Sequence, residues 1–205
     1  MTDVAQQALD VRRPDHAIED LILQRWSPRA MSGDSLPPAQ LMRLFEAARW
    51  APSSGNQQPW RFVYATRDSA GWSDFLGLLD DGNREWAHRA AALIIVVSRT
   101  TSEPGGRELG THAFDTGAAW ENLALQGVAQ GLVIHGMAGF DYGRAREVAG
   151  VPDGFDVQAM VAVGLPGDPD DLSERRRNRE RPSSRRPLHE IVFEERFPAS
   201  EDDAP

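Results

Sequence analysis

The stretch AALIIVVS, residues 91–98, restricts the possible folds of this chain more than any other feature. A short, uninterrupted apolar run between polar segments is typical of a strand that is buried on both faces of a sheet. Such a strand requires other elements to cover the sheet on both sides. A chain of 205 residues is long enough to do this within one domain with a substantial core.

The remaining segments mix helical and strand-like patterns, which predicts an α+β (mixed α/β) class in a single domain. We expect residues 1–15 to form a flexible N-terminal arm, residues 16–197 the globular domain and residues 198–205 a disordered acidic tail. Helices are predicted within 16–26, 32–51, 68–82, 115–132 and 142–151, strands within 60–66, 91–98, 133–141 and 155–166, and a late strand or extended arm within 188–197.

Composition excludes several classes of function. The net charge of -9 gives no electrostatic help to a general binder of nucleic acid or of anionic membranes. The absence of Cys excludes disulfides and thiolate chemistry, and no metal-ligand cluster is evident. The N-terminus lacks the apolar core of a signal peptide, and no apolar run approaches membrane-spanning length, so a cytoplasmic location is expected.

Three polar segments lie beside core elements. In RWSPR, Arg25, Ser27 and Arg29 could bind a phosphate together with a second electron-rich group, because guanidinium groups pair with phosphate in a directional way. The same residues could equally be cations that stabilise a helix C-terminus. All 22 basic residues are Arg, so every fixed cation in this chain is a guanidinium.

The other two segments are APSSGNQQPW and HGMAGF. The first, residues 51–60, joins a predicted helix to a predicted strand, and its Ser and Asn residues are also common in ordinary connecting loops. In the second, Gly136 and Gly139 would let the backbone approach a flat ligand closely, although a simple turn explains them too.

In this order the segments resemble the nitroreductase family of FMN-dependent oxidoreductases, from about Ile18 to about Val192. The most specific match is EAARWAPSSGNQQPWRFV, followed by RWSPRAM, by GLVIHGMAGFD and by the C-terminal SSRRPLHEIV. The resemblance implies a nitroreductase-like fold with a central mixed β-sheet flanked by helices. It also implies a homodimer in which the helix around Asp115–Gln130, apolar on nearly every side, is the main dimerisation element.

By matched position, the resemblance assigns cofactor-binding roles. Arg25 and Ser27 would bind the FMN phosphate and ribityl region, and Arg185 would close on the phosphate. Arg29 would lie near the pyrimidine end of the flavin and tune it, with no catalytic side chain and no metal required. The full predicted set is Arg25, Trp26, Ser27, Arg29, Met137, Ala138, Gly139 and Arg185 from one subunit, with Pro52, Ser53, Ser54 and Asn56 from the other.

The implied activity is transfer of a hydride from NADH or NADPH to a small electron-poor acceptor, such as a nitroaromatic or a quinone, by a ping-pong mechanism. Alternatives are a protein that stores or senses FMN without efficient reduction, or a specialised relative such as a dehalogenase, a flavin-fragmenting enzyme or a biosynthetic oxidase. The sequence has no GxGxxG element for a tightly held dinucleotide, which fits a nicotinamide that binds only transiently.

Some positions depart from the family pattern. Ala138 stands where many relatives carry Glu, and Asn83 or Arg84 could replace a Lys that contacts the flavin in some relatives.

His135 is interpreted as a hydrogen-bonded core residue, and His112 as either a solvated loop residue or a substrate contact. Trp60 is expected to anchor a strand in the core, Arg175–Arg177 to form a solvated face, and residues 99–113 at most a short lid.

Overall fold

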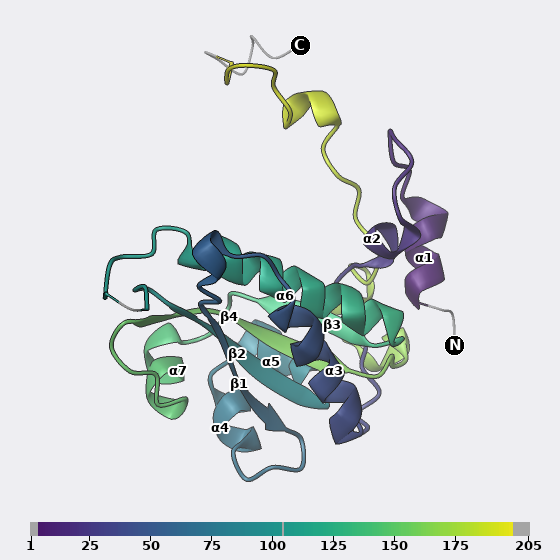
Figure 1. Cartoon of the computed structure of the whole chain (residues 1–205). Coiled ribbons are helices and arrows are strands. Elements are labelled where there is room, and N and C mark those ends of the chain that lie inside the picture. The colour runs from purple at the N-terminus through teal and green to yellow at the C-terminus, as the bar shows by residue number, and fades with distance from the viewer. Residues whose placement is uncertain (1–3, 104, 199–205) are drawn as a thin grey trace.

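The computed structural model describes residues 4–103 and 105–198 (Figure 1). Its centre is a sheet of four strands in the order β1-β2-β4-β3, formed by β1 (Trp60–Thr66), β2 (Ala92–Arg99), β4 (Phe155–Gly164) and β3 (Val133–Met137). The predicted fold class is confirmed. All three pairings are antiparallel, however, rather than mixed. Of the two predictions for residues 188–197, a late strand or an extended arm, the structure has the arm, with the short turn of helix at Leu188–Glu190.

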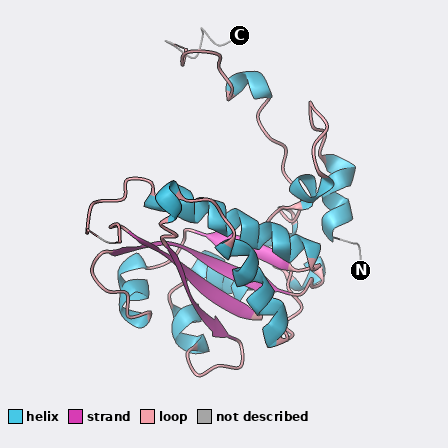
Figure 2. Cartoon of the chain, in the orientation of Figure 1, coloured by secondary structure: helices cyan, strands magenta, loops and turns pink. Residues whose placement is uncertain are grey.

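Strand β2 is buried at every one of its eight positions, as its continuous apolar run predicts. Its side chains alternate between two cores, because successive residues of a strand point to opposite faces. Leu93 and Ile95 belong to one core, whereas Ile94 and Val96 belong to the other. The sheet therefore needs a layer of helices on each face (Figure 2).

Two long helices cover one face, α3 (Pro38–Arg49) and α6 (His112–Ala129). Helix α3 begins at the predicted Pro pair, with Pro37 as its N-cap residue. The other face packs against three short helices, α4 (Trp72–Gly77), α5 (Asp81–Ala87) and α7 (Tyr142–Val148). Trp60 is 7% exposed at the start of β1, which confirms its predicted place in the core.

Helix α6 is buried only on the face that meets the sheet and α3. Asp115, Ala119 and Leu123 are buried, but Phe114 is 81% exposed. The all-round burial predicted for this helix is therefore incomplete within one chain. The uncovered side remains available for the predicted subunit contact.

The N-terminal segment contains two helices, α1 (Val4–Val11) and α2 (Asp20–Gln24), which pack together. Ala8 of α1 is fully buried, so part of the expected flexible arm, residues 1–15, is helical and packed, while its flexibility stays a prediction. The shorter elements are η1 (Ser54–Asn56), η2 (Pro169–Asp171), α8 (Glu174–Arg177) and η3 (Leu188–Glu190).

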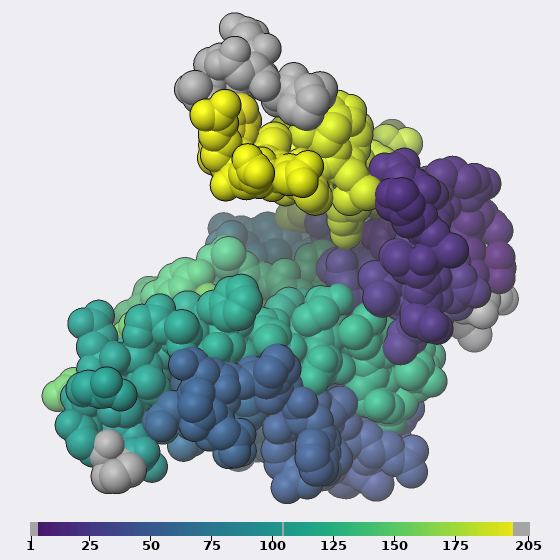
Figure 3. Space-filling model, turned by 45° about the horizontal axis from the view of Figure 1, so that its top comes forward, coloured from purple at the N-terminus to yellow at the C-terminus, as the bar shows by residue number. Residues whose placement is uncertain are grey.

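Residues from about 182 to 198 form an extended arm beside the N-terminal segment (Figures 1 and 3). Leu188, Ile191, Val192 and Phe197 are exposed on this arm. The predicted acidic tail, residues 198–205, lies almost wholly outside the described residues.

Candidate cofactor site

Two adjoining cavities share Arg25 and Ser27 as walls. The first, of about 340 Å³, we call the arginine cavity; its described lining contains no Asp or Glu side chain. The second, of about 490 Å³, we call the glycine-rich cavity; it is lined by Gly136, Met137 and Ala138, with Trp120 of α6. The arginine cavity is lined by Arg12, Arg25, Trp26, Ser27, Arg29, His135, Arg179, Arg181, Ser183 and Arg185.

The backbone after α2 explains why Arg25, Ser27 and Arg29 line one cavity. Arg25 ends the helix in an extended conformation, and alternate residues of an extended chain lie on the same side. Trp26 lies between them at the cavity edge, is 7% exposed and donates through Nε1 to the Val4 carbonyl at 2.9 Å. Its indole therefore also fastens α1 to the domain.

Arg25 reaches from the arginine cavity to α6. Its Nε lies 3.2 Å from Glu121 Oε1, and its Nη1 donates to Ser27 Oγ at 3.4 Å. The ion pair holds the guanidinium at the boundary between the two cavities. Among the described residues, Arg185 of the C-terminal arm donates hydrogen bonds to its own neighbours, the oxygens of Ser183 and Ser184, at 3.0–3.4 Å.

Glu180 holds the backbone at Arg29, a contact that sequence reasoning did not find. Its Oε1 accepts hydrogen bonds from the backbone N–H groups of Arg29 and Ala30 at 2.5 and 2.8 Å. Its Oε2 lies 3.8 Å from Arg29 Nη1. Burial lowers the pKa of the Arg29 guanidinium; Glu180 raises this pKa, whereas Arg176 lowers it.

His135 forms part of the floor of the arginine cavity and is a hydrogen-bonded core residue, as predicted. It is 8% exposed, its Nδ1 lies 2.9 Å from the Pro28 carbonyl, and its ring centroid is 4.5 Å from that of Trp86. Burial above all, helped by the positive charge of Arg29, lowers the pKa of His135 to about 4, although the hydrogen bond with the Pro28 carbonyl acts to raise this pKa. The ring is therefore neutral at neutral pH.

The glycine-rich segment has two different reasons for its glycines. Gly136 is exposed to the glycine-rich cavity, and a Cβ there would approach the Trp120 ring to 3.2 Å. A Cβ at Gly139 would lie 2.1 Å from Asp80 Oδ2, because Asn83 and Asp80 hold this backbone close. Gly139 does not line either cavity, so here close packing against the start of α5 requires the glycine, whatever its proposed role in cofactor binding.

Asn83 and Arg84 also act on backbone and line neither cavity. Asn83 Nδ2 donates to the Gly139 carbonyl at 3.0 Å, and Arg84 Nη2 donates to the Leu79 carbonyl at 2.5 Å. Asn83 therefore positions the glycine-rich segment.

Arg176 is not part of the predicted solvated face, because its side chain is 12% exposed and pairs with Glu85 at 3.2 Å.

The segment Pro52–Pro59, which we call the polar loop, lies beside the start of α6, away from α2 (Figure 1). Its backbone is prearranged: Asn56 and Gln58 have φ angles of 53° and 46°, which non-glycine residues rarely adopt. Ser53 Oγ accepts from the Gln58 N–H at 3.0 Å. None of the predicted residues Pro52, Ser53, Ser54 and Asn56 lines the two cavities of its own chain.

Two buried charged residues support the polar loop, and sequence reasoning missed both. Asp115, 5% exposed, accepts the Ser54 N–H at 3.1 Å. Arg99, also 5% exposed, donates through Nη2 to the Gln57 carbonyl at 3.1 Å and through Nη1 to the Thr101 carbonyl. Each binds loop backbone that is distant in the sequence, so the residue type alone does not indicate this role.

His112 begins α6, and its Nδ1 lies 2.8 Å from Ser98 Oγ. Ser98 is fully buried and also accepts a hydrogen bond from Gln158 Nε2 at 2.8 Å. This contact joins the start of α6 to β2 and β4. His112 is therefore neither a freely solvated loop residue nor a residue that lines the two cavities.

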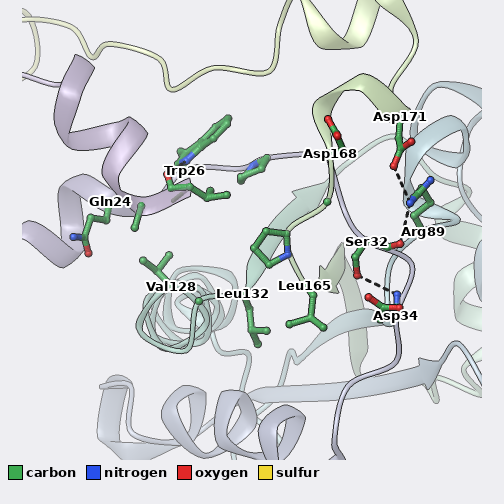
Figure 4. A pocket seen from close by; sticks show the side chains of 16 residues that line it. Gln24, Trp26, Ser32, Asp34, Arg89, Val128, Leu132, Leu165, Asp168 and Asp171 are labelled. Carbon is green, nitrogen blue, oxygen red and sulfur yellow. Dashed lines mark hydrogen bonds and ion pairs between the residues drawn. The ribbon is translucent and has the colours of Figure 1, made fainter. Parts of the chain in front are cut away.

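A further cavity, of about 570 Å³, lies between Trp26, Leu165 and Arg89 (Figure 4). Its one lining cation among the described residues already has partners: Arg89 pairs with Asp171 at 2.9 Å and donates to the Met31 and Ser32 carbonyls at 2.9 Å. Of the predicted cofactor residues, only Trp26 lines this cavity. It therefore does not combine the expected binding groups.

Within residues 4–103 and 105–198, no group of three His, Asp or Glu residues is arranged to hold a metal ion. In the same part of the chain, no helix is both long enough and apolar enough to cross a membrane.

Comparisons with known proteins agree with the fold. The nitroreductase family model matches residues 22–76 and 72–165. A crystal structure described as an oxidoreductase containing FMN is 44% identical, with a TM-score of 0.89 over 92% of this chain and 97% of that one. The NADH dehydrogenase of Thermus thermophilus is 28% identical over 209 residues, which cover 83% of this chain and 92% of that protein.

A second solved structure, of a candidate nitroreductase in complex with FMN from Desulfovibrio desulfuricans, is 25% identical, with a TM-score of 0.66 over 87% of this chain and 96% of that one. The family match spans both the RWSPR segment and the glycine-rich segment that form the two cavities. The chain therefore belongs to the nitroreductase family of oxidoreductases.

Proposed function

We propose that this protein is an FMN-dependent oxidoreductase of the cytoplasm that takes a hydride from NADH or NADPH. The acceptor would be a small, flat, electron-poor molecule such as a nitroaromatic or a quinone. The observation that carries the proposal is the pair of adjoining cavities, one lined by arginines and one by glycine-rich backbone and Trp120. Proteins of known structure that contain FMN share this fold.

The residues present fit the chemistry of FMN. The arginine cavity suits a phosphate dianion, because its guanidinium N–H groups can donate to the phosphate oxygens and their positive charge balances the negative charge. No carboxylate of the described lining competes for these groups. The neighbouring cavity offers the apolar surface and exposed backbone that a flat ring needs. FMN, when bound, supplies the hydride chemistry itself, so no nucleophilic side chain is required.

In this proposal the side chains bind and orient the cofactor. Arg25 and Arg185 hold the phosphate, while Ser27 holds the ribityl chain at the boundary between the cavities. The backbone of Met137 and Ala138, which line the glycine-rich cavity, would face the flavin ring, and Gly139, which lines neither cavity, would present its backbone next to them. Arg29 provides a fixed positive charge that favours the reduced, more negative form of the ring.

The proposed site is completed by a second subunit. Pro52, Ser53, Ser54 and Asn56 of one chain would contact the flavin held by the other. This fits a loop that is firmly braced yet lines neither cavity of its own chain. Exposed apolar residues on α6 and the C-terminal arm, such as Phe114 and Phe197, each 81% exposed, offer surface for the contact.

The first experiment measures FMN binding and reduction. The purified protein should bind FMN, and under anaerobic conditions NADH or NADPH should bleach the flavin rapidly. Steady-state rates at varied nicotinamide and acceptor should give parallel reciprocal plots, because one site is used by each in turn. A protein that takes up no FMN contradicts the proposal, and bound FMN that neither nicotinamide reduces favours a storage or sensing role.

The shared site is tested by mixing two inactive variants. Arg25→Ala should weaken FMN binding by about 1.5–3 kcal/mol, the scale of a lost charged hydrogen bond. Subunits with Arg25→Ala, mixed and reassociated with Asn56→Ala subunits, should regain some intact sites. If the mixture is no more active than the two variants alone, or if the protein is a monomer that binds FMN tightly, the shared site is wrong.

A further inference from the structure

Arg12 joins three segments that are far apart in the sequence. It follows the end of α1 and precedes the part of the chain that matches the family. Its Nη1 donates to the carbonyls of Leu23 and Arg25 at 2.6 and 2.7 Å. Its Nε donates to the Ser183 carbonyl, in the C-terminal arm, at 3.2 Å.

These contacts aim the Arg12 guanidinium into the arginine cavity beside Arg25 and Arg185. Burial lowers the pKa of Arg12, and the positive charges of Arg185 and Arg25 lower it further. Arg25 has a carboxylate partner in Glu121, but that carboxylate lines the other cavity. Three cations thus face one space in which the described lining supplies no counter-charge.

Like charges held together oppose folding unless an anion compensates them. Among the residues that the structure describes, the hydrogen bonds of Arg12 employ Nε and Nη1, which leaves the two N–H groups of Nη2 for a ligand. A phosphate dianion would both accept these hydrogen bonds and neutralise the cluster. The carbonyl contacts already fix the guanidinium, so little side-chain entropy is lost on binding.

We infer that Arg12 is a third phosphate-binding arginine, which the N-terminal segment adds to the flavin site. The inference rests on the proposed function, because the phosphate is that of FMN. Arg12 would also connect the N-terminal segment and the C-terminal arm to the cofactor, since one guanidinium contacts all three.

The experiment compares FMN with riboflavin, which has no phosphate, in fluorescence titrations of the apoprotein. Arg12→Ala should raise the Kd for FMN about tenfold to hundredfold, the range expected for a charged hydrogen bond. The Kd for riboflavin should stay within about twofold of the wild type, because the lost contact is to phosphate.

Arg13→Ala is the matched control. Arg13 is the next residue and carries the same charge, and its hydrogen bonds within the described part of the chain go to carbonyls at and just after the end of α1, those of Leu9, Asp10 and Arg12. Its replacement should leave both dissociation constants within about twofold, because Arg13 does not line the arginine cavity. An equal loss of FMN affinity in both variants would show a general charge effect and overturn the specific role of Arg12.

A second variant covers the case in which Arg12→Ala does not fold. Arg12→Gln keeps a donor for the carbonyl contacts but removes the charge, and it should show the same selective loss of FMN. Inorganic phosphate should raise the melting temperature of the wild-type apoprotein more than that of Arg12→Gln. Equal phosphate stabilisation of the two proteins counts against the inference.

The outcomes separate this inference from the proposed function. If the wild type binds FMN but Arg12→Gln binds it equally well, Arg12 is not a phosphate ligand and the flavin site stands. If FMN and riboflavin affinities fall by the same factor, Arg12 only fastens the segments together, which also overturns the inference. If the wild type binds neither flavin, the proposed function fails, and the phosphate melting experiment still tests Arg12.

Discussion

The arginine cavity and the polar loop are built in opposite ways. In the loop, every charged support has a protein partner: Asp115 accepts the Ser54 N–H, and Arg99 donates to the Gln57 carbonyl. In the cavity, Arg12, Arg25 and Arg185 face one another across a space lined by no acidic side chain of the described chain. One region is complete without a ligand, whereas the other is electrostatically incomplete.

This difference separates two ways of preparing a binding site. The polar loop stores its geometry in the backbone, including the rare φ angles of Asn56 and Gln58, and is expected to keep its shape in the apoprotein. The arginine cavity stores unfavourable charge repulsion, which a bound anion relieves. Stability should therefore depend strongly on the braces of the loop, and weakly on the arginines that face the cavity.

The largest expected effect is a loss of stability at low pH, which we expect to arise in the arginine cavity through His135. The pKa of His135 is lowered from 6.5 to about 4, so the native state excludes a proton that the unfolded state binds below pH 6.5. The stabilising contribution is complete above pH 6.5 and is lost as the pH falls to 4. The loss amounts to about 3 kcal/mol in the free energy of unfolding, measured by urea denaturation from pH 8 to pH 4.

His135→Asn keeps a donor for the Pro28 carbonyl but cannot take up the proton, so its stability should fall less steeply over the same pH range. His189→Gln, on the exposed C-terminal arm, is the control and should retain the wild-type pH dependence. The charges that act on the pKa of His135 are those of Arg29 and Arg176, and both are cations that oppose its protonation. Identical pH profiles for wild type and His135→Asn would exclude this origin of acid sensitivity.

The second prediction tests the braced region. Arg99→Met keeps an apolar stem but leaves the Gln57 and Thr101 carbonyls without their donor, which should lower the free energy of unfolding by about 2–3 kcal/mol. Arg107→Met, at an exposed position in the loop that follows β2, should change this free energy by less than about 0.5 kcal/mol. Arg185→Ala, in the cavity, should be equally mild. If Arg185→Ala destabilises the apoprotein as much as Arg99→Met, the contrast between the regions does not hold.

The third and smallest effect concerns Arg29, which lines the arginine cavity and is paired with Glu180. If it tunes the flavin, Arg29→Ala should lower the midpoint potential of bound FMN by about 30 mV or more, equivalent to about 1.4 kcal/mol for two electrons. Arg29→Lys should recover part of this change, because it restores the charge without the planar guanidinium.

Arg179→Ala, which removes an exposed guanidinium from the same cavity, is the control for Arg29. It should weaken FMN binding with little change in potential. A redox titration in which Arg29→Ala behaves like Arg179→Ala would place Arg29 among the anion ligands.

Sequence reasoning predicted the elements whose signal is local. The buried strand β2, the proline-initiated helix α3 and the buried ring of His135 follow from apolar spacing and turn residues, which depend on neighbours in the chain. The antiparallel sheet and the helical N-terminal segment could not be read in this way, because pairing partners and packing surfaces are non-local.

In the candidate site, too, some residues could be predicted from the sequence, whereas contacts between distant segments could not. Arg25, Ser27, Arg29 and Arg185 were named through family resemblance, and the structure brings them around one cavity. Glu180 and Arg12 were missed, and Asn83 was considered only as a flavin contact, because each of these side chains binds backbone atoms of a distant segment. Glu180 and the Arg29 N–H, for example, are 151 residues apart. A contact to a backbone group leaves no residue-type signature at its partner position.

The contact between Arg12 and Ser183, which lie 171 residues apart, has a consequence for how the protein is made. The walls of the arginine cavity come from residues 12–29 and 179–185, together with His135, so this cavity cannot exist on a ribosome-bound chain until its last segments emerge. The sheet core, by contrast, is complete once residue 164 has been added. Cofactor capture is therefore a late event, and a truncated chain could form its core without ever gaining the cavity.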